Sequence, residues 1–285
     1  MTHTIHAPLL DLDQTLNSGQ VFRFRKVGDR YFVCVRDNLF WLRQNGEKLE
    51  FGGVDEAFVR RFLDLDYDLE AALRRISRVR QMRPAVRACR GIRILQHDYW
   101  ECLVSFICST RSNIPKIKRS LNLLSACHGR RVRCEGESDY AFPAPGSLCD
   151  IRKLKSSGIG YRAEYLFETS RLCTNGLLES IARLPYAQAR EELKKFPGVG
   201  DKVADCVCLF SMRFREAFPV DVWVQRAMLE LFPGCGKNEK QVRQAAMEIF
   251  GPDAGYAEQY LFQYWRIRAG KAAIMTNSVV GDNGM

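Results

Sequence analysis

The sequence predicts an α+β protein, in which an N-terminal antiparallel β-sheet domain is followed by an all-helical region. Phe22 and Phe24 alternate with Arg23 and Arg25, which is the period-2 pattern of a half-buried strand. From Asp55 onward the apolar residues instead recur at helical spacing, and the last ten residues, 276–285, are expected to be a frayed tail. These two periodicities lead us to expect a sheet first and helices afterwards.

We place the N-terminal domain at residues 1–97, with a β meander and two flanking helices. Asn-Gly and Asp-Asn pairs between apolar runs are typical of tight turns that join antiparallel strands. The expected strands are 22–25, 31–35, 39–42 and 49–51, and the expected helices run from Phe58 to Leu65 and from Leu69 to Val79.

Residues 98–285 are predicted to be entirely helical. Asp98 and Glu101 form an N-cap and N3 pair directly before the apolar run 102–107. Further helices are expected at 113–127, 161–173 and 186–196, and from Lys202, Val222, Asn238 and Ala254.

The charge balance favours a polyanionic partner. The chain has 43 Lys and Arg against 33 Asp and Glu, a net charge of +10, so nucleic acid is the leading class of partner. No run approaches the ~20 apolar residues of a membrane span, and the N-terminus lacks the pattern of a signal peptide. The 11 cysteines are scattered without Cys-x-x-Cys pairs, which fits a reducing compartment better than a disulfide scaffold.

The most informative segment is 195–206, Lys-Phe-Pro-Gly-Val-Gly-Asp-Lys-Val-Ala-Asp-Cys. Pro197 ends one helix, Gly198 and Gly200 permit a tight turn with open backbone, and the next helix starts at once. The free N–H groups of such a start can hold a phosphate. With Val199 at the turn, this pattern predicts a helix-hairpin-helix at about 187–213; a plain loop between two core helices is the alternative.

Lys202 in this hairpin and Asp221 further along the chain form a candidate catalytic pair. Asp221 stands where a capping residue starts a helix, and a cap is its simplest interpretation. A neutral lysine amine can also attack a sugar carbon, while a carboxylate stabilises the positive charge that develops on the sugar. The pair therefore fits the removal of a base from DNA.

The motifs resemble the helix-hairpin-helix–GPD glycosylase superfamily and, within it, the 8-oxoguanine DNA glycosylase family. The resemblance covers nearly the whole chain, with its motifs in the family order. They are Ser-Gly-Gln-Val-Phe-Arg at 18–23, Trp-Glu-Cys-Leu-Val-Ser-Phe-Ile at 100–107, Ile-Gly-Tyr-Arg-Ala at 159–163, the hairpin at 196–206, Pro-Val-Asp-Val at 219–222 and Gly-Pro-Asp-Ala-Gly-Tyr-Ala at 251–257.

The resemblance implies that a damaged base is flipped out of the duplex into a pocket. The Gly19 carbonyl would accept a hydrogen bond from the N7–H that only the oxidised guanine carries. Cys206 and Phe262 would sandwich the base, although core packing is the plainer interpretation of both. Glu258 replaces the family Gln at the Watson–Crick edge of the lesion, and its carboxylate can accept from both N–H groups there.

The same resemblance places a set of DNA contacts. Tyr161 would fill the gap in the duplex, and Arg162 would contact the estranged base; without the resemblance, this pair is ordinary surface and core. The loop 111–116 departs from the family pattern, because Arg111 stands at an Asn position and Lys116 at an Arg position. Asn113 is retained, and Trp223 replaces the His that follows Asp-Val.

Taken together, these residues predict a bifunctional DNA glycosylase and lyase for 8-oxoguanine that acts through a Lys202 Schiff base and tolerates different opposite bases. We expect a monomer whose partner is double-stranded DNA with an oxidised purine. No cofactor, metal or membrane is expected, and the location is intracellular: cytoplasm or nucleoid in a prokaryote, nucleus in a eukaryote.

Two other functions remain open. One is a glycosylase of the same superfamily for another base; Lys202 argues against its alkylation branch, and the lack of cysteines after Cys235 excludes the usual iron–sulfur run. The other is a non-enzymatic helix-hairpin-helix module, which accounts for Gly198 and Gly200 but not for Lys202 with Asp221.

Overall fold

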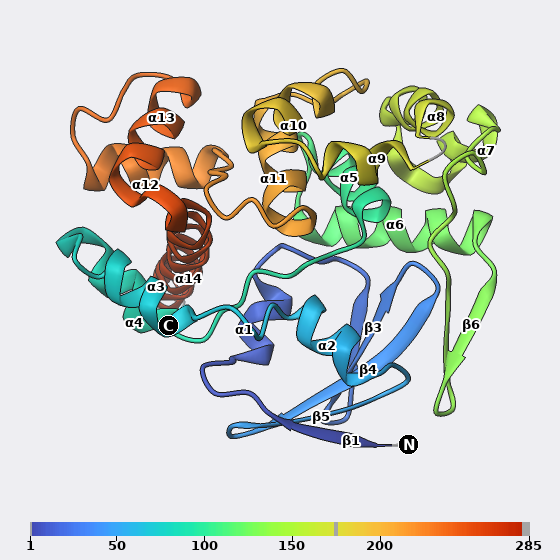
Figure 1. Cartoon of the computed structure of the whole chain (residues 1–285), viewed down its shortest axis with the longest axis horizontal. Helices are drawn as coiled ribbons and strands as arrows, with labels where there is room; N and C mark the ends of the chain where they lie inside the picture. The colour runs from blue at the N-terminus through green and yellow to red at the C-terminus, as the bar shows by residue number, and fades with distance from the viewer. Residues whose placement is uncertain (1, 174–175, 281–285) are drawn as a thin grey trace.

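The computed structural model describes residues 2–173 and 176–280, with side chains up to Gly270. It has the predicted α+β architecture, with an antiparallel sheet followed by a mostly helical region. The sheet lies at one end of the molecule and most of the helices lie over it or beside it (Figure 1).

The sheet contains five strands in the order β1-β5-β4-β3-β2, and each neighbouring pair is antiparallel. The sequence did not predict β1, because its four residues bury only Ile5 and show no alternation. Strand β2 begins at Phe24 rather than Phe22, since Phe22 turns into the core of the helical region. The strands are β1 His3–His6, β2 Phe24–Val27, β3 Arg30–Val35, β4 Asn38–Asn45 and β5 Lys48–Gly52.

The prediction that the chain is entirely helical from residue 98 is wrong. A hairpin of β6 (Arg131–Cys134) and β7 (Glu137–Tyr140) interrupts the helices. Val132 and Cys134 of β6 are buried against Trp41 of β4. Arg131 and Arg133 alternate with these two side chains, so the period-2 pattern is present in the sequence, but only over the four residues of β6.

The predicted helices are present with their predicted caps. The Asp98 carboxylate accepts a hydrogen bond from the Glu101 N–H at 3.0 Å, and the Asn113 side chain accepts from the Lys116 N–H at 3.0 Å. Short helices α1, α4, α7 and α9 were not predicted. The helices are α1 Leu12–Asn17, α2 Glu56–Phe62, α3 Leu69–Ile76, α4 Arg83–Ala88, α5 Tyr99–Ser109, α6 Ile114–His128, α7 Ile151–Leu154, α8 Arg162–Leu172, α9 Leu177–Ile181, α10 Tyr186–Leu193, α11 Asp201–Ser211, α12 Val222–Leu231, α13 Glu239–Phe250 and α14 Ala254–Val280.

Two large hydrophobic clusters hold the molecule together. One lies between the sheet and helices α1 and α2, and includes Leu16, Phe40 and Phe62. The other runs through the helical region and also includes side chains of α3 and α4. The domain boundary after residue 97 stays a prediction. The clusters do not divide the chain there, because α4 packs against α14 and α3 packs against the 3-10 helix Gly251–Asp253 that precedes α14.

Candidate active site

The turn between α10 and α11 has the geometry of a hairpin with open backbone. Gly198 has φ of +77°, and a Cβ atom there would lie 2.6 Å from the Tyr165 ring. Any side chain at this position would therefore meet both backbone strain and a clash. Gly200 is the N-cap of α11, and a Cβ on it would meet no atom within 4 Å, whereas Val199 between them is buried.

A buried carboxylate anchors α11 to its neighbours. Asp205 accepts hydrogen bonds from the Tyr186 hydroxyl at 2.6 Å and from Arg190 Nε at 2.8 Å, and it pairs with Arg243 at 3.1 Å. Burial raises the pKa of Asp205, and the two arginines oppose that shift. These contacts join α10, α11 and α13, and so hold the hairpin helix in one orientation.

A cavity of about 670 Å³ opens beside the start of α11. It brings together residues from segments far apart in the sequence, which is what a catalytic pocket requires. Eight of the predicted catalytic, lesion-binding and DNA-binding residues line it: Gly19, Arg111, Asn113, Gly198, Gly200, Lys202, Asp221 and Phe262.

The Lys202 amine lies in this cavity against α5. Nζ donates a hydrogen bond to Ser109 Oγ at 3.1 Å and lies 5.0 Å from the centre of the Phe106 ring. The Ser109 hydroxyl donates its own proton to the Phe106 carbonyl at 2.7 Å. Its oxygen can therefore only accept from Lys202, which leaves the lone pair of a neutral amine free. No sequence pattern predicted that Ser109 and Phe106 contact the lysine.

Asp221 is both a helix cap and a cavity residue. Its carboxylate accepts from the Val224 N–H at 2.8 Å and caps α12, as its simplest interpretation predicted. Burial raises its pKa, while the nearby Lys202 and Arg266 lower it. The group can thus stabilise a positive charge that develops in the cavity.

Gly19 and Phe262 lie next to each other in the wall of the cavity. Gly19 has φ of +80°, and a Cβ there would lie 3.2 Å from Phe262 Cε1 and 3.4 Å from Ile114 Cδ1. A side chain at position 19 would therefore fill the space beside the Phe262 ring.

Cys206 and Glu258 do not line the cavity but lie buried close behind it. Burial raises the pKa of the Cys206 thiol to about 12. Burial also raises the pKa of Glu258 well above its ordinary value, and the Asp221 charge adds to that shift. Glu258 Oε2 has no hydrogen-bond partner among the described residues. This oxygen is therefore available for a hydrogen bond to a bound ligand.

Two residues without an assigned role also line the cavity. Arg266 donates to the Asn17 carbonyl at 3.0 Å and lies 5.3 Å from the centre of the Phe262 ring, and burial lowers its pKa. Trp223 is an exposed aromatic side chain at the start of α12. The sequence drew attention to Trp223 because it departs from the family pattern, but no sequence signal indicated Arg266.

The remaining predicted DNA contacts lie outside the cavity. Arg162 is buried and donates to the Thr110 carbonyl, which ties the start of α8 to the loop after α5. Tyr161 is 51% exposed and packs edge-on against Tyr165. Lys116 is exposed on the first turn of α6.

Two negative findings apply to the described part of the chain. No group of three or more His, Cys, Asp or Glu side chains is placed to hold a metal ion among these residues. No described helix combines the length and the apolarity that a membrane crossing needs.

Known proteins resemble this chain in sequence and structure. Residues 4–103 match the family model of the 8-oxoguanine DNA glycosylase N-terminal domain. An N-glycosylase/DNA lyase of Saccharomyces cerevisiae is 32% identical, over 96% of this chain and 85% of that protein. A probable N-glycosylase/DNA lyase of Methanothermobacter thermautotrophicus is 36% identical, but that alignment covers 62% of this chain and 64% of the relative.

Among solved structures, the Clostridium acetobutylicum 8-oxoguanine glycosylase/lyase, bound to double-stranded DNA with cytosine opposite 8-oxoguanine, is 32% identical. Its TM-score is 0.88, and the match covers 94% of this chain and 98% of that one. The fold and these relatives define a DNA glycosylase with lyase activity. The chain belongs to the 8-oxoguanine DNA glycosylase family of N-glycosylase/DNA lyases.

Proposed function

We propose that this chain excises 8-oxoguanine from double-stranded DNA, with Lys202 as the nucleophile. The observation that carries the proposal is the position of the Lys202 amine. The amine lies in the cavity with Asp221 and Gly19. It donates a hydrogen bond to the Ser109 hydroxyl, which acts toward it only as an acceptor, and it forms no ion pair among the described residues. The Clostridium relative has the same fold and was solved on DNA that contains this lesion.

The proposed reaction begins with attack of the neutral Lys202 amine on C1′ of the damaged nucleotide. The Nζ–C1′ bond forms as the glycosidic bond breaks, the electron pair leaves with the base, and a proton passes from Nζ toward the departing base. The nitrogen lone pair then forms the C1′=N bond of a protonated Schiff base as the C1′–O4′ bond breaks, and O4′ takes up a proton from water. Loss of a C2′ proton expels the 3′-phosphate and cleaves the strand. Asp221 stabilises the positive charge on the sugar.

The pocket residues would provide recognition of the lesion. The Gly19 carbonyl accepts from the N7–H of 8-oxoguanine, whereas the bare N7 of guanine would face it as a second acceptor. Phe262 stacks on one face of the base, Cys206 contacts the other, and Glu258 receives its Watson–Crick edge. Cys206 and Glu258 are buried and do not line the cavity, so their side chains must become accessible before the base can contact them.

We also propose a relaxed preference for the base opposite the lesion. Lys116 and Arg111 replace an arginine and an asparagine of the family pattern, and a lysine cannot reproduce the planar fork of a guanidinium. Arg162 keeps its place, and its bond to Thr110 links it to the same loop. With Asn113, Tyr161 and the hairpin residues 198–200, these side chains would form the DNA-binding face.

The decisive test is Lys202→Gln, with Lys195→Gln on the same hairpin as the matched control. We expect the first variant to lose base release and borohydride trapping while it still binds lesion duplex, since the rest of the basic surface supplies affinity. The control should keep all three activities, because Lys195 is exposed and paired with Glu192. Undiminished excision by Lys202→Gln would contradict the proposal that Lys202 is the nucleophile. Excision assays on a panel of damaged bases would show whether the enzyme prefers a lesion other than 8-oxoguanine.

A further inference from the structure

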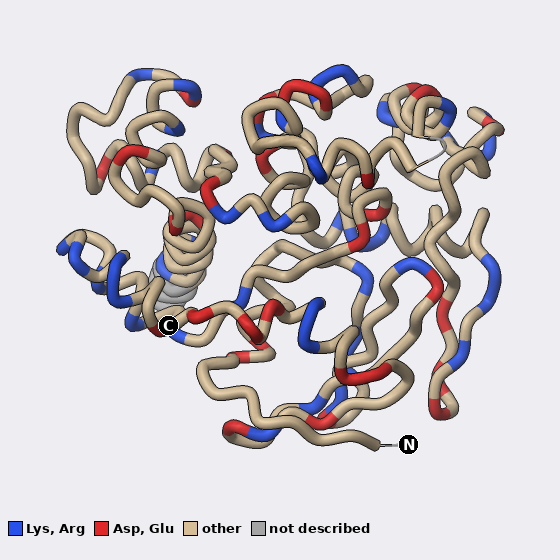
Figure 2. The backbone as a smooth tube through the Cα atoms, in the orientation of Figure 1, with Lys and Arg blue, Asp and Glu red and all other residues tan. Residues whose placement is uncertain are grey.

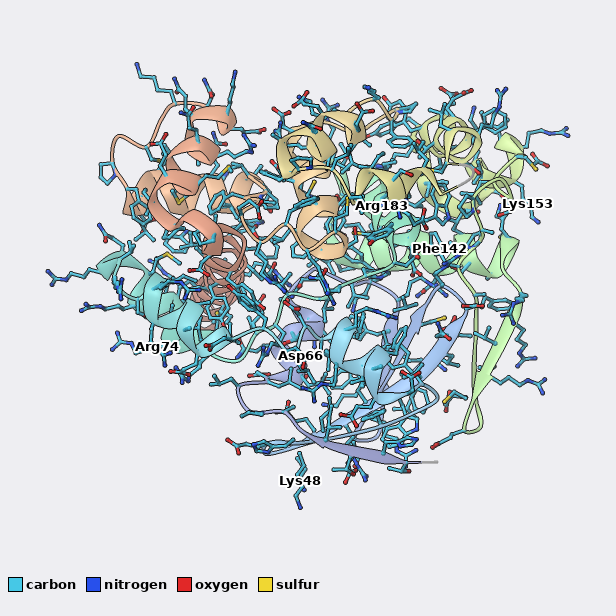
Figure 3. The ribbon with its side chains drawn as sticks, in the orientation of Figure 1. Lys48, Asp66, Arg74, Phe142, Lys153 and Arg183 are labelled. Atoms are coloured by element: carbon cyan, nitrogen blue, oxygen red, sulfur yellow. The ribbon has the colours of Figure 1, made fainter. Side chains whose placement is uncertain are left out.

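Seven arginines gather on the surface formed by α3, α4 and the turn between them. All are exposed, and the stretch 74–90 that carries them contains no Asp or Glu. We call this set the α3–α4 basic surface; its members are Arg74, Arg75, Arg78, Arg80, Arg83, Arg87 and Arg90. Blue segments accumulate over these two helices in Figure 2, and Figure 3 places Arg74 at that edge of the molecule.

Most of this charge is not neutralised within the protein. Arg75 is paired with Asp253 at 2.6 Å, and Glu70 contacts Arg90 at 2.7 Å and Arg74 at 3.9 Å. Arg78, Arg80 and Arg87 form no ion pair or hydrogen bond among the described side chains. A hollow of about 310 Å³ opens beside them and is lined by Arg74, Arg78, Arg83 and Arg90 as well as Glu70. Clustered guanidinium groups of this kind suit phosphate oxygens.

The basic surface lies on the opposite side of α14 from the cavity. Phe262 and Arg266 of α14 line the cavity. Tyr256 and Tyr260 point the other way: Tyr256 stacks on Tyr67 at 5.1 Å, and the Tyr260 hydroxyl donates to the Ile92 carbonyl at 3.2 Å. Residues four apart share one helix face and residues two apart lie on opposite faces. No residue of the stretch 74–90 lines the cavity.

We propose that the α3–α4 basic surface is a second phosphate-binding site, which holds a segment of undamaged duplex DNA while the cavity holds another. The surface offers charge without an exposed large apolar side chain, which fits a DNA backbone better than the apolar core of a protein interface. Two contacts to one polyanion would raise the local concentration of DNA at the enzyme. This inference goes beyond the proposed function and does not depend on Lys202 or Asp221.

The test compares two triple variants of the full chain. The basic-surface variant carries Arg78→Ser, Arg80→Ser and Arg87→Ser. The charge-matched control carries Lys48→Ser on the sheet together with Arg131→Ser and Arg133→Ser on the β6–β7 hairpin. Binding of short undamaged duplexes is measured by sedimentation and by fluorescence titration over a range of salt. We expect two duplexes per unmodified chain and per control, but one per basic-surface variant. At low salt, where a second duplex still binds the variant weakly, the slope of log K against log salt for that duplex should be smaller by about 2 to 3, because each lost phosphate contact removes ~0.9 from the slope.

Excision from a saturating short lesion duplex should stay unchanged in the basic-surface variant, which also shows that it is folded. A failure of the proposed function would appear in that excision assay and not in the stoichiometry. A single duplex per unmodified chain, or equal stoichiometry and affinity in both triple variants, would overturn the inference. So would a variant that keeps both duplexes but loses binding to polyglutamate or to anionic lipid vesicles, since the surface would then serve an acidic protein or a membrane.

Discussion

Among single residues, Asp221 has two roles: it caps helix α12, and it places a negative charge in the cavity. A single substitution can remove the charge and keep the cap. Its carboxylate caps α12 through the Val224 N–H and also faces the cavity that holds Lys202. Asparagine caps a helix as well as aspartate does, but it carries no charge.

We therefore expect Asp221→Asn to slow single-turnover excision by ~10²–10³ while the melting temperature stays close to that of the unmodified protein. Asp221→Ala should lose the same activity and in addition ~1 kcal/mol of stability from the missing cap. If Asp221→Asn instead lowers the melting temperature and leaves the rate intact, the residue is a cap alone.

Glu258 allows a prediction about pH. Burial raises the pKa of Glu258 in the folded protein well above the ordinary glutamate value of 4.5. Between these two values the folded state binds more protons than the unfolded state, so the free energy of unfolding decreases as pH rises through this window.

Glu258→Gln should abolish that contribution. The melting temperature of the variant relative to the unmodified protein should therefore increase from pH 5 to pH 8, with the two proteins more alike at the acidic end. Excision of 8-oxoguanine should remain within a modest factor, because glutamine still offers one acceptor oxygen. Loss of most activity would reveal a charge-dependent role for Glu258, and parallel stability curves would contradict the linkage argument.

At the scale of elements, the loop between α5 and α6 is the part of the candidate site that departs most from its family. Arg111 has φ of +49° there, and Asn113 uses its side chain to cap α6. A bidentate contact to a base is worth ~1–3 kcal/mol of discrimination, so replacing the family arginine with Lys116 should relax the choice of opposite base.

We expect the preference for cytosine, measured as the ratio of the excision rate opposite cytosine to the rate opposite adenine, guanine or thymine, to be small. This ratio should be roughly 10- to 100-fold lower than in an enzyme with the full arginine–asparagine set. Lys116→Arg with Arg111→Asn should sharpen the cytosine preference in single-turnover assays with each of the four opposite bases. A thousandfold cytosine preference in the unmodified protein would show that Arg111 reads the base in another way.

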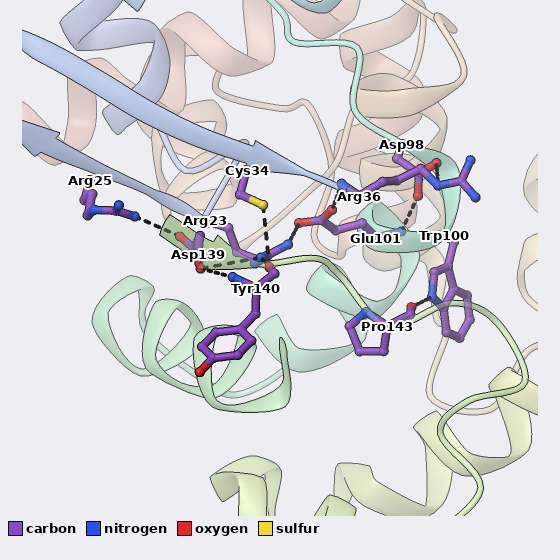
Figure 4. A network of polar contacts seen from close by, with 10 residues as sticks. All are labelled: Arg23, Arg25, Cys34, Arg36, Asp98, Trp100, Glu101, Asp139, Tyr140 and Pro143. Carbon is purple, nitrogen blue, oxygen red and sulfur yellow. Dashed lines mark hydrogen bonds and ion pairs between the residues drawn. The ribbon is translucent and has the colours of Figure 1, made fainter. Parts of the chain in front are cut away.

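At the scale of the whole molecule, one buried ion pair joins the sheet domain to the helix that carries Ser109. Arg23 pairs with Glu101 of α5 at 3.1 Å, and both side chains are 1% exposed (Figure 4). Arg23 also donates to the Tyr140 carbonyl, and Glu101 accepts from the Arg36 N–H at 2.7 Å. The pair thus ties together β3–β4, α5 and the β6–β7 hairpin.

Arg23→Met should destabilise the protein by about 3–5 kcal/mol in urea unfolding, because it leaves the Glu101 charge buried and unpaired. The double variant with Glu101→Met should recover much of that loss, since it removes both charges. Excision per folded molecule should change little in either variant. Equal stability of the single and double variants would mean that the backbone contacts, rather than the charge pair, hold the interface.

Features of the fold that have a local cause could be predicted from the amino-acid sequence alone. Period-2 alternation placed most of the sheet, Asp98, Asn113 and Asp221 marked helix starts, and Gly198 with Gly200 marked the hairpin, because each depends on the chain within a few residues of itself. The order of motifs also identified the family that the relatives confirm.

The contacts between side chains from distant parts of the sequence became visible only in the tertiary structure. Ser109 and Phe106 contact Lys202 from a helix that is distant in the sequence, and Arg266 and Asp221 line the same cavity from two other helices, so no local pattern predicts that these residues come together. Strand β1 and the β6–β7 hairpin were missed because four-residue strands gain their stability from partners elsewhere in the chain. The cavity exists for the same reason: long-range packing brings Gly19, Lys202 and Phe262 around one space.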